Sequence, residues 1–240
     1  MEILLVGYGR MGRLIADTIS SLEDCNVCGI IDIDDMHRLP SMSTRCDAII
    51  DFSHPDMLKP ISEYVKRTGA ALVSGTTNMT ADDMALLKSL GEYAPVIHAA
   101  NYSIGIAALK KALQSITPVL GDAYDIEMTE AHHKHKSDAP SGTAKMLFNA
   151  INAEGKYTPV YGRSPEDGKR EKNEVGIHAL RGGSVAGEHA VYFLGEGERV
   201  MLSHSAEGRQ VFVNGAIEAA RRIIKKPKGV YTFEQLLFGE

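Results

Sequence analysis

The chain has 240 residues, of which 44% are hydrophobic and 24% charged, and its formal net charge is −5. This composition is ordinary for a globular protein of one large or two modest domains, and the negative charge gives no reason to expect a nucleic-acid partner. No stretch reaches the ~18 consecutive apolar residues of a membrane span. A strand-like run at the start and only three cysteines favour a cytoplasmic protein without a signal peptide.

The first predicted element is a short buried strand over residues 2–6, and apolar residues recur at helical spacing from Leu14 to Leu22. Between them lies a GxGxxG motif, the arrangement typical of dinucleotide binding. Its glycines allow a tight turn, a close approach to a pyrophosphate and close packing of the helix on the strand. The predicted cofactor-binding residues here are Gly7, Tyr8, Gly9, Arg10, Met11 and Gly12. A tight turn without a ligand is the alternative.

The second predicted strand, residues 26–31, ends at Asp32, which lies 20 residues after Gly12. Dinucleotide-binding folds place a carboxylate near this position, where it accepts hydrogen bonds from the adenosine ribose. We therefore predict that Asp32 binds the cofactor. Asp34 and Asp35 are nearby alternatives, and a solvated acidic turn is the remaining interpretation.

Three further strands, residues 48–50, 71–73 and 95–98, are expected to alternate with helices. This alternation predicts an α/β fold with a Rossmann-like, doubly wound parallel sheet. Ligands of such sheets bind beyond the carboxyl ends of the strands, so segments that follow strands are candidates to hold a nicotinamide ring. These candidates are Gly75, Thr76, Thr77, Ala99, Ala100, Asn101 and Tyr102. For the two threonines, a simple turn is an equally open interpretation.

The pattern changes near Ile104, where a long helix is expected to run to Pro118. Further strands are expected at residues 125–129 and, as an antiparallel set, at 177–180, 190–194 and 199–203. We predict an inserted α+β domain over residues 104–213, which binds substrate and forms oligomers, and a dinucleotide-binding domain over 1–103 and 214–240. In the dinucleotide-binding domain, a helix is expected to begin at Asn214, and the apolar tail, residues 230–238, is expected to dock on a core. The polar segment 164–174 is interpreted as a mobile surface loop. Arg181 either faces the cleft or belongs to a turn.

The stretch from Glu130 to Leu147 is the most distinctive part of the chain. It places His132, His133 and His135 beside two lysines and then opens a helix with Ser141-Gly142-Thr143. Helix N-termini bind anions, and histidine exchanges protons near neutral pH, so the stretch suits a small anionic substrate that must be protonated. A solvated charged loop is one alternative. A zinc site is another, but adjacent histidines point apart, and the Cys25-x-x-Cys28 pair is interpreted as structural.

These motifs together resemble the dihydrodipicolinate reductase family, now usually called 4-hydroxy-tetrahydrodipicolinate reductases, of bacterial lysine and diaminopimelate synthesis. The resemblance covers nearly the whole chain and is most specific over residues 130–144. Shorter motifs fall in the family's order at Gly9-Arg10-Met11-Gly12, Gly75-Thr76-Thr77, Asn101-Tyr102-Ser103, Arg181-Gly182-Gly183 and Asn214-Gly215-Ala216. One departure is Val6-Gly7-Tyr8-Gly9, because the family often spaces these glycines as G-x-x-G.

The resemblance implies an oxidoreductase and a homotetramer that reduces a small cyclic dicarboxylate with NADH or NADPH. It implies that His132 donates or accepts a proton and that Lys136 is a second proton donor. The substrate carboxylates would then be bound by His133, Lys136, Ser141, Gly142 and Thr143. A non-catalytic dinucleotide-binding sensor is the alternative function, but it leaves the histidine stretch without a purpose.

Overall fold

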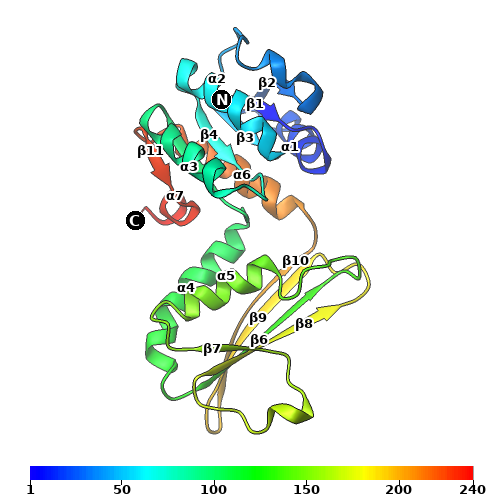
Figure 1. Ribbon diagram of the computed structural model, residues 1–240, viewed down its shortest axis with the longest axis vertical. Coiled ribbons are helices and arrows are strands. Elements are labelled where there is room, and N and C mark those ends of the chain that lie inside the picture. The colour runs from blue at the N-terminus through cyan, green and yellow to red at the C-terminus, as the bar shows by residue number, and fades with distance from the viewer. Residues whose placement is uncertain (240) are drawn as a thin grey trace. The chain divides into compact units, whose positions relative to one another are not determined.

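The computed structural model describes residues 1–239, which form two compact units (Figure 1). The first unit comprises residues 1–104 and the segment from Gln210 onward, and the second comprises residues 105–209. The chain returns to the first unit through helix α6, Gln210–Ile223. The sequence analysis placed the start of this helix at Asn214, which is too late. Val213, Ile217 and Ala220 are buried at helical spacing, so the apolar face begins before Asn214.

The first unit is built on a six-stranded sheet with the strand order β11-β5-β4-β3-β1-β2. Every neighbouring pair is parallel, which confirms the predicted doubly wound sheet. The strands are β1 (Glu2–Val6), β2 (Asn26–Ile31), β3 (Ala48–Asp51), β4 (Ala71–Ser74), β5 (Pro95–His98) and β11 (Gly229–Tyr231). The order reverses between β1 and β3, and the crevice outside such a switch point is where these sheets bind ligands.

The helices of the first unit are α1 (Arg10–Ser20), α2 (Leu58–Thr68), α3 (Ala81–Ser89), α6 and α7 (Phe233–Phe238). Strands β1, β3 and β4 are buried almost throughout, as expected for a parallel sheet covered by helices. Helix α3 begins at Ala81, and the side chain of the preceding Thr80 forms a capping box with Asp83. The apolar tail also docks as expected, because β11 pairs with β5 and α7 buries Phe233 and Leu236.

The second unit contains helices α4 (Ile104–Leu120) and α5 (Gly142–Ile151) and a five-stranded sheet. Its strands are β6 (Asp125–His132), β7 (Thr158–Tyr161), β8 (Glu174–Arg181), β9 (Gly187–Leu194) and β10 (Arg199–Ala206). The order is β10-β9-β6-β8-β7, and β9 is antiparallel to both β6 and β10, as expected. Strand β8 runs parallel to β6, however, so the prediction that it belongs to an antiparallel set was wrong.

One face of this sheet is buried, and side chains from that face pack with side chains of α4 and α5. The core formed there includes Leu113 from α4, Leu147 from α5 and Met128, Val191 and Phe193 from the strands. Along β6, buried side chains alternate with more exposed ones, and the last two buried positions are the polar residues Glu130 and His132. Two polar side chains are therefore presented on the core face of the central strand.

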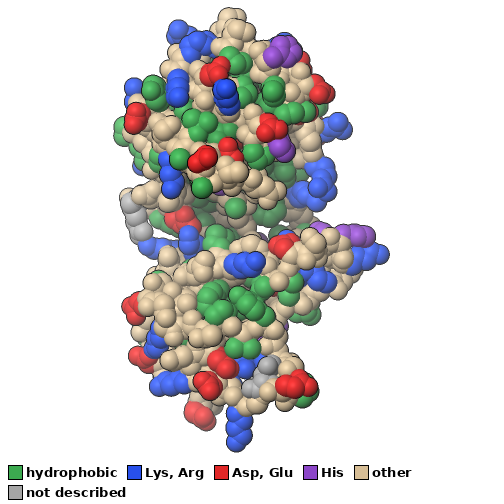
Figure 2. Space-filling view, viewed as in Figure 1, with side chains coloured by type: hydrophobic (Ala, Val, Ile, Leu, Met, Phe, Trp, Pro, Cys, Tyr) green, Lys and Arg blue, Asp and Glu red, His purple; other side chains and the backbone are tan. Residues whose placement is uncertain are grey.

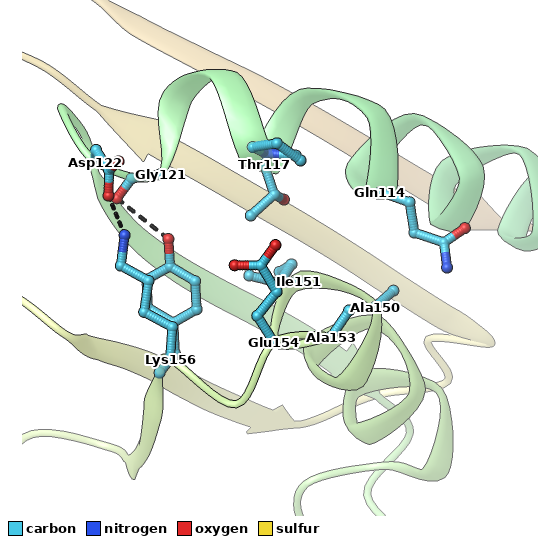
Figure 3. A pocket seen from close by; sticks show the side chains of 11 residues that line it. Gln114, Thr117, Gly121, Asp122, Ala150, Ile151, Ala153, Glu154 and Lys156 are labelled. Carbon is cyan, nitrogen blue, oxygen red and sulfur yellow. Dashed lines mark hydrogen bonds and ion pairs between the residues drawn. The ribbon is translucent and has the colours of Figure 1, made fainter.

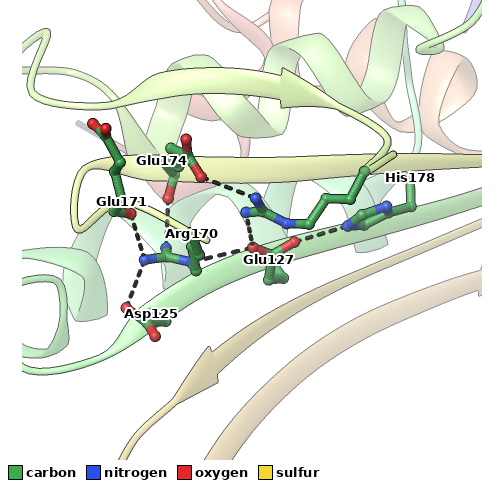
Figure 4. A network of polar contacts seen from close by, with 7 residues as sticks. Asp125, Glu127, Arg170, Glu171, Glu174 and His178 are labelled. Carbon is green, nitrogen blue, oxygen red and sulfur yellow. Dashed lines mark hydrogen bonds and ion pairs between the residues drawn. The ribbon is translucent and has the colours of Figure 1, made fainter. Parts of the chain in front are cut away.

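The segment between β7 and β8, predicted as a mobile loop, is anchored by ion pairs to the opposite face of the sheet (Figure 4). Glu127 on β6 accepts hydrogen bonds from Arg163 at 2.7 Å, Arg170 at 3.3 Å and His178 at 2.8 Å. Arg163 also pairs with Glu174 at 2.9 Å. Two arginines of the segment are thus held by one half-buried carboxylate, which fixes the path of the chain there.

Charged side chains of both signs are interspersed over the face drawn in Figure 2, in keeping with the small net charge. Within residues 1–239, no helix is long and apolar enough to cross a membrane.

Candidate active site

The glycine motif forms the expected tight connection between β1 and α1. Gly7 has φ +89°, and a Cβ there would lie 2.5 Å from the Phe52 carbonyl oxygen. A Cβ on Gly12 would lie 2.0 Å from the Gly7 carbonyl oxygen, so the helix can pack this closely only without a side chain. Nothing lies within 4 Å of a Cβ built on Gly9. No side chain caps the start of α1, which leaves amides suited to a phosphate.

Asp32 lies beside this glycine motif because β1 and β2 are adjacent and parallel. The Gly7 amide donates to the Ile31 carbonyl oxygen at 2.8 Å, and Asp32 is the next residue. One oxygen of its exposed carboxylate accepts a hydrogen bond from the Ile33 amide at 2.9 Å and caps a short 3₁₀ turn over Ile33–Arg38. The carboxylate is therefore positioned at a strand end and keeps acceptor capacity for a ligand hydroxyl.

A buried carboxylate connects the ends of β3 and β4. Asp51, 2% exposed, accepts hydrogen bonds from Ser74 Oγ at 2.8 Å, from Thr76 Oγ1 at 2.9 Å and from Ser53 Oγ. Burial raises the pKa of Asp51, and the three hydroxyl hydrogen bonds oppose that rise. Sequence reasoning did not select Asp51 as a site residue. The available signal was an acidic residue directly after the buried Ile50.

The segment after β4 divides into a structural and an exposed part. Thr76 is buried, its hydroxyl is bound to Asp51, and its carbonyl oxygen lies 2.9 Å from His98 Nε2. Thr77 is exposed. Of the two predicted threonines, Thr77 therefore offers its side chain to a ligand, and Thr76 holds the segment in place.

The segment after β5 follows the same division. The Ala99 amide donates to the Ser74 carbonyl oxygen at 3.1 Å, and Ala100 is exposed. Asn101 Oδ1 accepts a hydrogen bond from the Ser103 amide at 2.7 Å. Tyr102, however, is 1% exposed and donates its hydroxyl to the same Ser74 carbonyl oxygen at 2.8 Å. Its ring packs against Phe52 and Phe233. Only the backbone of Tyr102 is thus available to a cofactor.

In the second unit, His132 is held by a buried ion-pair arrangement. Its Nδ1 lies 2.6 Å from Glu130 Oε2, and Arg181 binds both oxygens of the same carboxylate at 2.8 and 2.7 Å. The Ser141 amide donates to Glu130 Oε1 at 3.0 Å. Burial raises the pKa of Glu130, but the hydrogen bonds from Arg181, His132 and Ser141 outweigh burial and lower that pKa. Glu130 is therefore an anion that orients His132.

A second histidine lies against His132 on the neighbouring strand. His189 on β9 is 6% exposed, and its ring meets the His132 ring edge-on at a centroid distance of 5.2 Å. Its Nε2 lies 3.2 Å from Ser141 Oγ, which also caps α5 by accepting the Ala144 amide. Burial lowers the pKa of His189 to about 4, and the charge of His132 adds to this effect. His189 is therefore neutral at physiological pH.

The loop from His133 to Ser141 carries the remaining predicted residues to the start of α5. His133 is half-buried, and its Nδ1 has no hydrogen-bond partner among the residues that the structure describes. Lys136 Nζ lies 2.7 Å from Asp138 Oδ1. Gly142 is exposed, with nothing within 4 Å of a Cβ built on it, and Thr143 follows in the first turn. These residues thus lie on one short loop and the helix that it begins.

A cavity of about 290 Å³ lies elsewhere in the second unit, between the C-terminal parts of α4 and α5 (Figure 3). It is lined by Gln114, Thr117, Ile151, Glu154 and Lys156, among others, and includes none of the predicted site residues. Among the residues that the structure describes, no group of three or more His, Cys, Asp or Glu side chains is arranged to hold a metal ion.

Three residues of this arrangement were missed or left undecided by the sequence analysis. Glu130 was only the start of the histidine stretch, although extending the alternation of β6 places it on the core face with His132. Arg181 was left between a cleft and a turn, and its two bonds to Glu130 place it in the site. His189 carried no sequence signal, because its place depends on the pairing of β9 with β6.

Comparison with known proteins gives a consistent result over the whole chain. The family model described as dihydrodipicolinate reductase, N-terminus, matches residues 1–102, and the model described as its C-terminus matches residues 105–237. A protein of Exiguobacterium sp. named 4-hydroxy-tetrahydrodipicolinate reductase is 38% identical over 98% of this chain and 95% of its own. A Staphylococcus aureus protein of the same name is 38% identical over 98% of this chain and 100% of its own.

A solved structure supports the fold. Dihydrodipicolinate reductase from Paenisporosarcina sp. TG-14, described as dipicolinate-bound, matches with a TM-score of 0.78 at 22% identity and covers 97% of each chain. At 22% sequence identity, this similarity shows that the two chains share the fold.

Proposed function

The chain belongs to the dihydrodipicolinate reductase family, and we propose that it reduces 4-hydroxy-tetrahydrodipicolinate to tetrahydrodipicolinate with NADH or NADPH. It is thus an oxidoreductase of lysine and diaminopimelate biosynthesis. The observation that carries the proposed mechanism is His132, which a buried glutamate orients next to the N-terminus of α5. A proton donor beside an anion-binding helix end matches a dicarboxylate substrate that must be protonated.

The first unit suits a nicotinamide dinucleotide. The free space at Gly9 and the uncapped start of α1 would receive the pyrophosphate, and Asp32 would receive the adenosine ribose. Thr77 and the backbone after β5 would bind the carboxamide of the nicotinamide ring. When bound, the reduced nicotinamide supplies the hydride. The residues of this chain orient that ring and exclude water around it.

In the second unit, the two substrate carboxylates would be bound by groups at the start of α5. The Gly142 and Thr143 amides donate from the positive end of the helix, and Lys136 and His133 add charge or hydrogen bonds. Ser141 is different from its neighbours, because its amide and hydroxyl are engaged by Glu130, Ala144 and His189. We therefore assign Ser141 to holding the helix start in place.

His132 would handle the proton of the reaction. Its Nδ1 faces Glu130, so Nε2 is the nitrogen left to exchange a proton. The carboxylate of Glu130 orients the imidazole ring, and Lys136 acts as a second proton donor. The overall change adds one hydride and one proton to the substrate, and its 4-hydroxyl leaves as water. Neither the comparisons nor the arrangement around His132 supports the alternative of a non-catalytic sensor.

We also propose a homotetramer formed through the outer face of the second unit's sheet. Leu180, Leu194 and Met201 are 55%, 40% and 54% exposed, and strand pairing places them on the face away from α4 and α5. Large apolar side chains exposed together are typical of an association surface. Sedimentation equilibrium should give four subunits, and Met201→Glu should shift the protein to smaller species. A monomeric wild type would contradict this assembly.

A spectrophotometric assay tests the function directly. NADH and NADPH oxidation is followed at fixed ionic strength with enzymatically generated 4-hydroxy-tetrahydrodipicolinate as substrate. We expect oxidation that depends on both substrate and enzyme, and we expect it to be strongly reduced in His132→Ala. General acid–base groups typically contribute ~10²–10⁴-fold to the rate. Absence of cofactor oxidation in the wild type would overturn the proposed function.

A further inference from the structure

One of the groups assigned to a substrate carboxylate is already engaged by a carboxylate of the chain itself. Asp138 Oδ1 lies 2.7 Å from Lys136 Nζ. The hydrogen bond from Lys136 lowers the pKa of Asp138, so this side chain is an anion at neutral pH. The ammonium group of Lys136 is therefore paired with Asp138.

The backbone of Asp138 is fixed, whereas its side chain is not enclosed. Arg181 Nη2 donates to the Asp138 carbonyl oxygen at 2.6 Å, and Arg181 itself is held by both oxygens of Glu130. The Asp138 side chain is 48% exposed and the Lys136 side chain 24%. Rotation about the side-chain bonds of Asp138 can therefore release Lys136 without moving the loop.

The donors at the helix start are not equivalent. The Ser141 amide is bound to Glu130 at 3.0 Å, and the Ala144 amide to Ser141 Oγ at 3.1 Å. A substrate carboxylate at this helix end is therefore expected to use the Gly142 and Thr143 amides together with the charge of Lys136, which is paired with Asp138. If both carboxylates stayed beside Lys136, two like charges would share one site, which is unfavourable.

We propose that Asp138 is an internal competitor for the substrate carboxylate, holding Lys136 at the start of α5 until the substrate displaces it. The inference rests on the proposed function, because it assumes that a dicarboxylate binds at this helix end. Its consequence is unusual for a residue within a binding site. Removal of the Asp138 charge should strengthen ligand binding, since the ligand no longer has to break the Lys136–Asp138 pair.

The test is calorimetric titration of wild type and Asp138→Asn with pyridine-2,6-dicarboxylate at fixed ionic strength. We expect the Kd to fall roughly two- to fivefold in the variant, the size of a partly exposed ion pair. Asp138→Ser is a second variant with the same expectation, and circular dichroism checks the fold of both. Asp122→Asn is the matched control. It removes an exposed ion pair with Lys156 outside the predicted site and should leave the Kd unchanged.

An unchanged Kd in folded Asp138→Asn and Asp138→Ser would overturn the inference. Weaker binding would also overturn it, because Asp138 would then position Lys136 for the ligand instead of competing with the ligand. The turnover assay is run on the same wild-type preparation. If the wild type turns over the substrate and the variants have an unchanged Kd, only the proposed role of Asp138 is refuted. If the wild type shows no turnover, the proposed function itself is refuted.

Discussion

Glu130 Oε2 and His132 Nδ1 lie 2.6 Å apart, and both residues are on the buried face of β6. The two are separated by one residue, so the alternation of the strand places both on the same face. Arg181 binds both oxygens of the Glu130 carboxylate and compensates its burial. The charge of Glu130 therefore directs the His132 proton at Nδ1 toward the strand and leaves Nε2 for chemistry.

Glu130→Gln should lower kcat with little effect on KM, because the amide keeps the shape but loses the charge that orients His132. We expect a loss of roughly ten- to hundredfold, part of what a general acid contributes. Glu127→Gln is the matched control, since Glu127 is an ion-paired carboxylate on the opposite face of the same strand. Steady-state kinetics across pH measures both variants. An equal loss of kcat in Glu130→Gln and Glu127→Gln would mean that Glu130 affects the rate only through the stability of the fold.

Lys136→Ala should lower kcat and raise KM together, because a positive charge near the substrate and a proton donor are both lost. Lys134→Ala should have little effect, since Lys134 is exposed on the same loop and no ion pair is formed by it among the described residues. Thr143→Ala should mainly raise KM. The measurement is the pH dependence of kcat for the three variants. If Lys136→Ala and Thr143→Ala show the same pH profile, Lys136 has no protonic role.

Asp51→Ala should destabilise the first unit, because it leaves the hydroxyls of Ser53, Ser74 and Thr76 without their buried acceptor. Each unsatisfied buried group costs about 1–3 kcal/mol, so we expect a loss of about 2–4 kcal/mol in the free energy of unfolding. Asp51→Asn should lose much less, since hydroxyls can rotate to accept from its amide. Urea denaturation gives the stabilities, and fluorescence titration should show weaker NADH binding in Asp51→Ala. Equal stability of both variants would contradict this account.

The protein should lose stability on acidification through His189. Its pKa in the folded protein is lowered to about 4 by burial, whereas the unfolded chain has the ordinary value of about 6.5. Between these values the unfolded state binds more protons, so stability falls as the pH drops, by about 3 kcal/mol at most. His189→Gln should flatten the pH dependence in this window. The smaller slope that remains is expected from His204, whose pKa is also lowered by burial. Denaturation curves recorded from pH 7 to pH 4 give the free energy of unfolding at each pH. An identical dependence of that free energy on pH in wild type and His189→Gln would refute the role of His189.

The fold of the first unit could be predicted from the sequence because its signals are local. A glycine motif follows a buried strand, and strands alternate with helices, so connectivity almost dictates a parallel sheet. The direction of β8 could not be predicted in this way, since pairing with β6 is a non-local choice that a short apolar run does not encode. Strand β7 was missed because it is a four-residue edge strand that contains Pro159.

The candidate site could likewise be predicted only in part from the sequence. The residues that carry chemistry, His132, Lys136 and the start of α5, are contiguous and could be selected by residue type. The residues that hold them, Glu130, Arg181 and His189, come from three strands and meet only in the folded sheet. For Tyr102, residue type did not predict that the side chain is buried, so its predicted contact with the cofactor can come only from the backbone.

The cofactor preference depends on Asp32, which lies beside the glycine motif with one carboxylate oxygen bound to the Ile33 amide. The carboxylate can accept hydrogen bonds from the ribose 2′- and 3′-hydroxyls of NADH, whereas the 2′-phosphate of NADPH would meet it with like charge. The next residue, Ile33, supplies no cation. Arg38 is a few residues on, but it is paired with Asp35 at 3.2 Å, which limits its ability to neutralise the phosphate.

We therefore expect NADH to be preferred in kcat/KM by roughly tenfold, equivalent to ~1.4 kcal/mol of differential binding. Asp32→Ser should narrow or invert this ratio, because the hydroxyl keeps a polar contact and removes the repulsion. Asp34→Ser is the matched control, an acidic residue in the following turn, and should leave the ratio unchanged. The measurement is kcat/KM with each cofactor for the three proteins at fixed ionic strength. A wild-type preference for NADPH, or a ratio that Asp32→Ser leaves unaltered, would show that this carboxylate does not contact the ribose and that Arg10, His37 or Arg38 governs the choice instead.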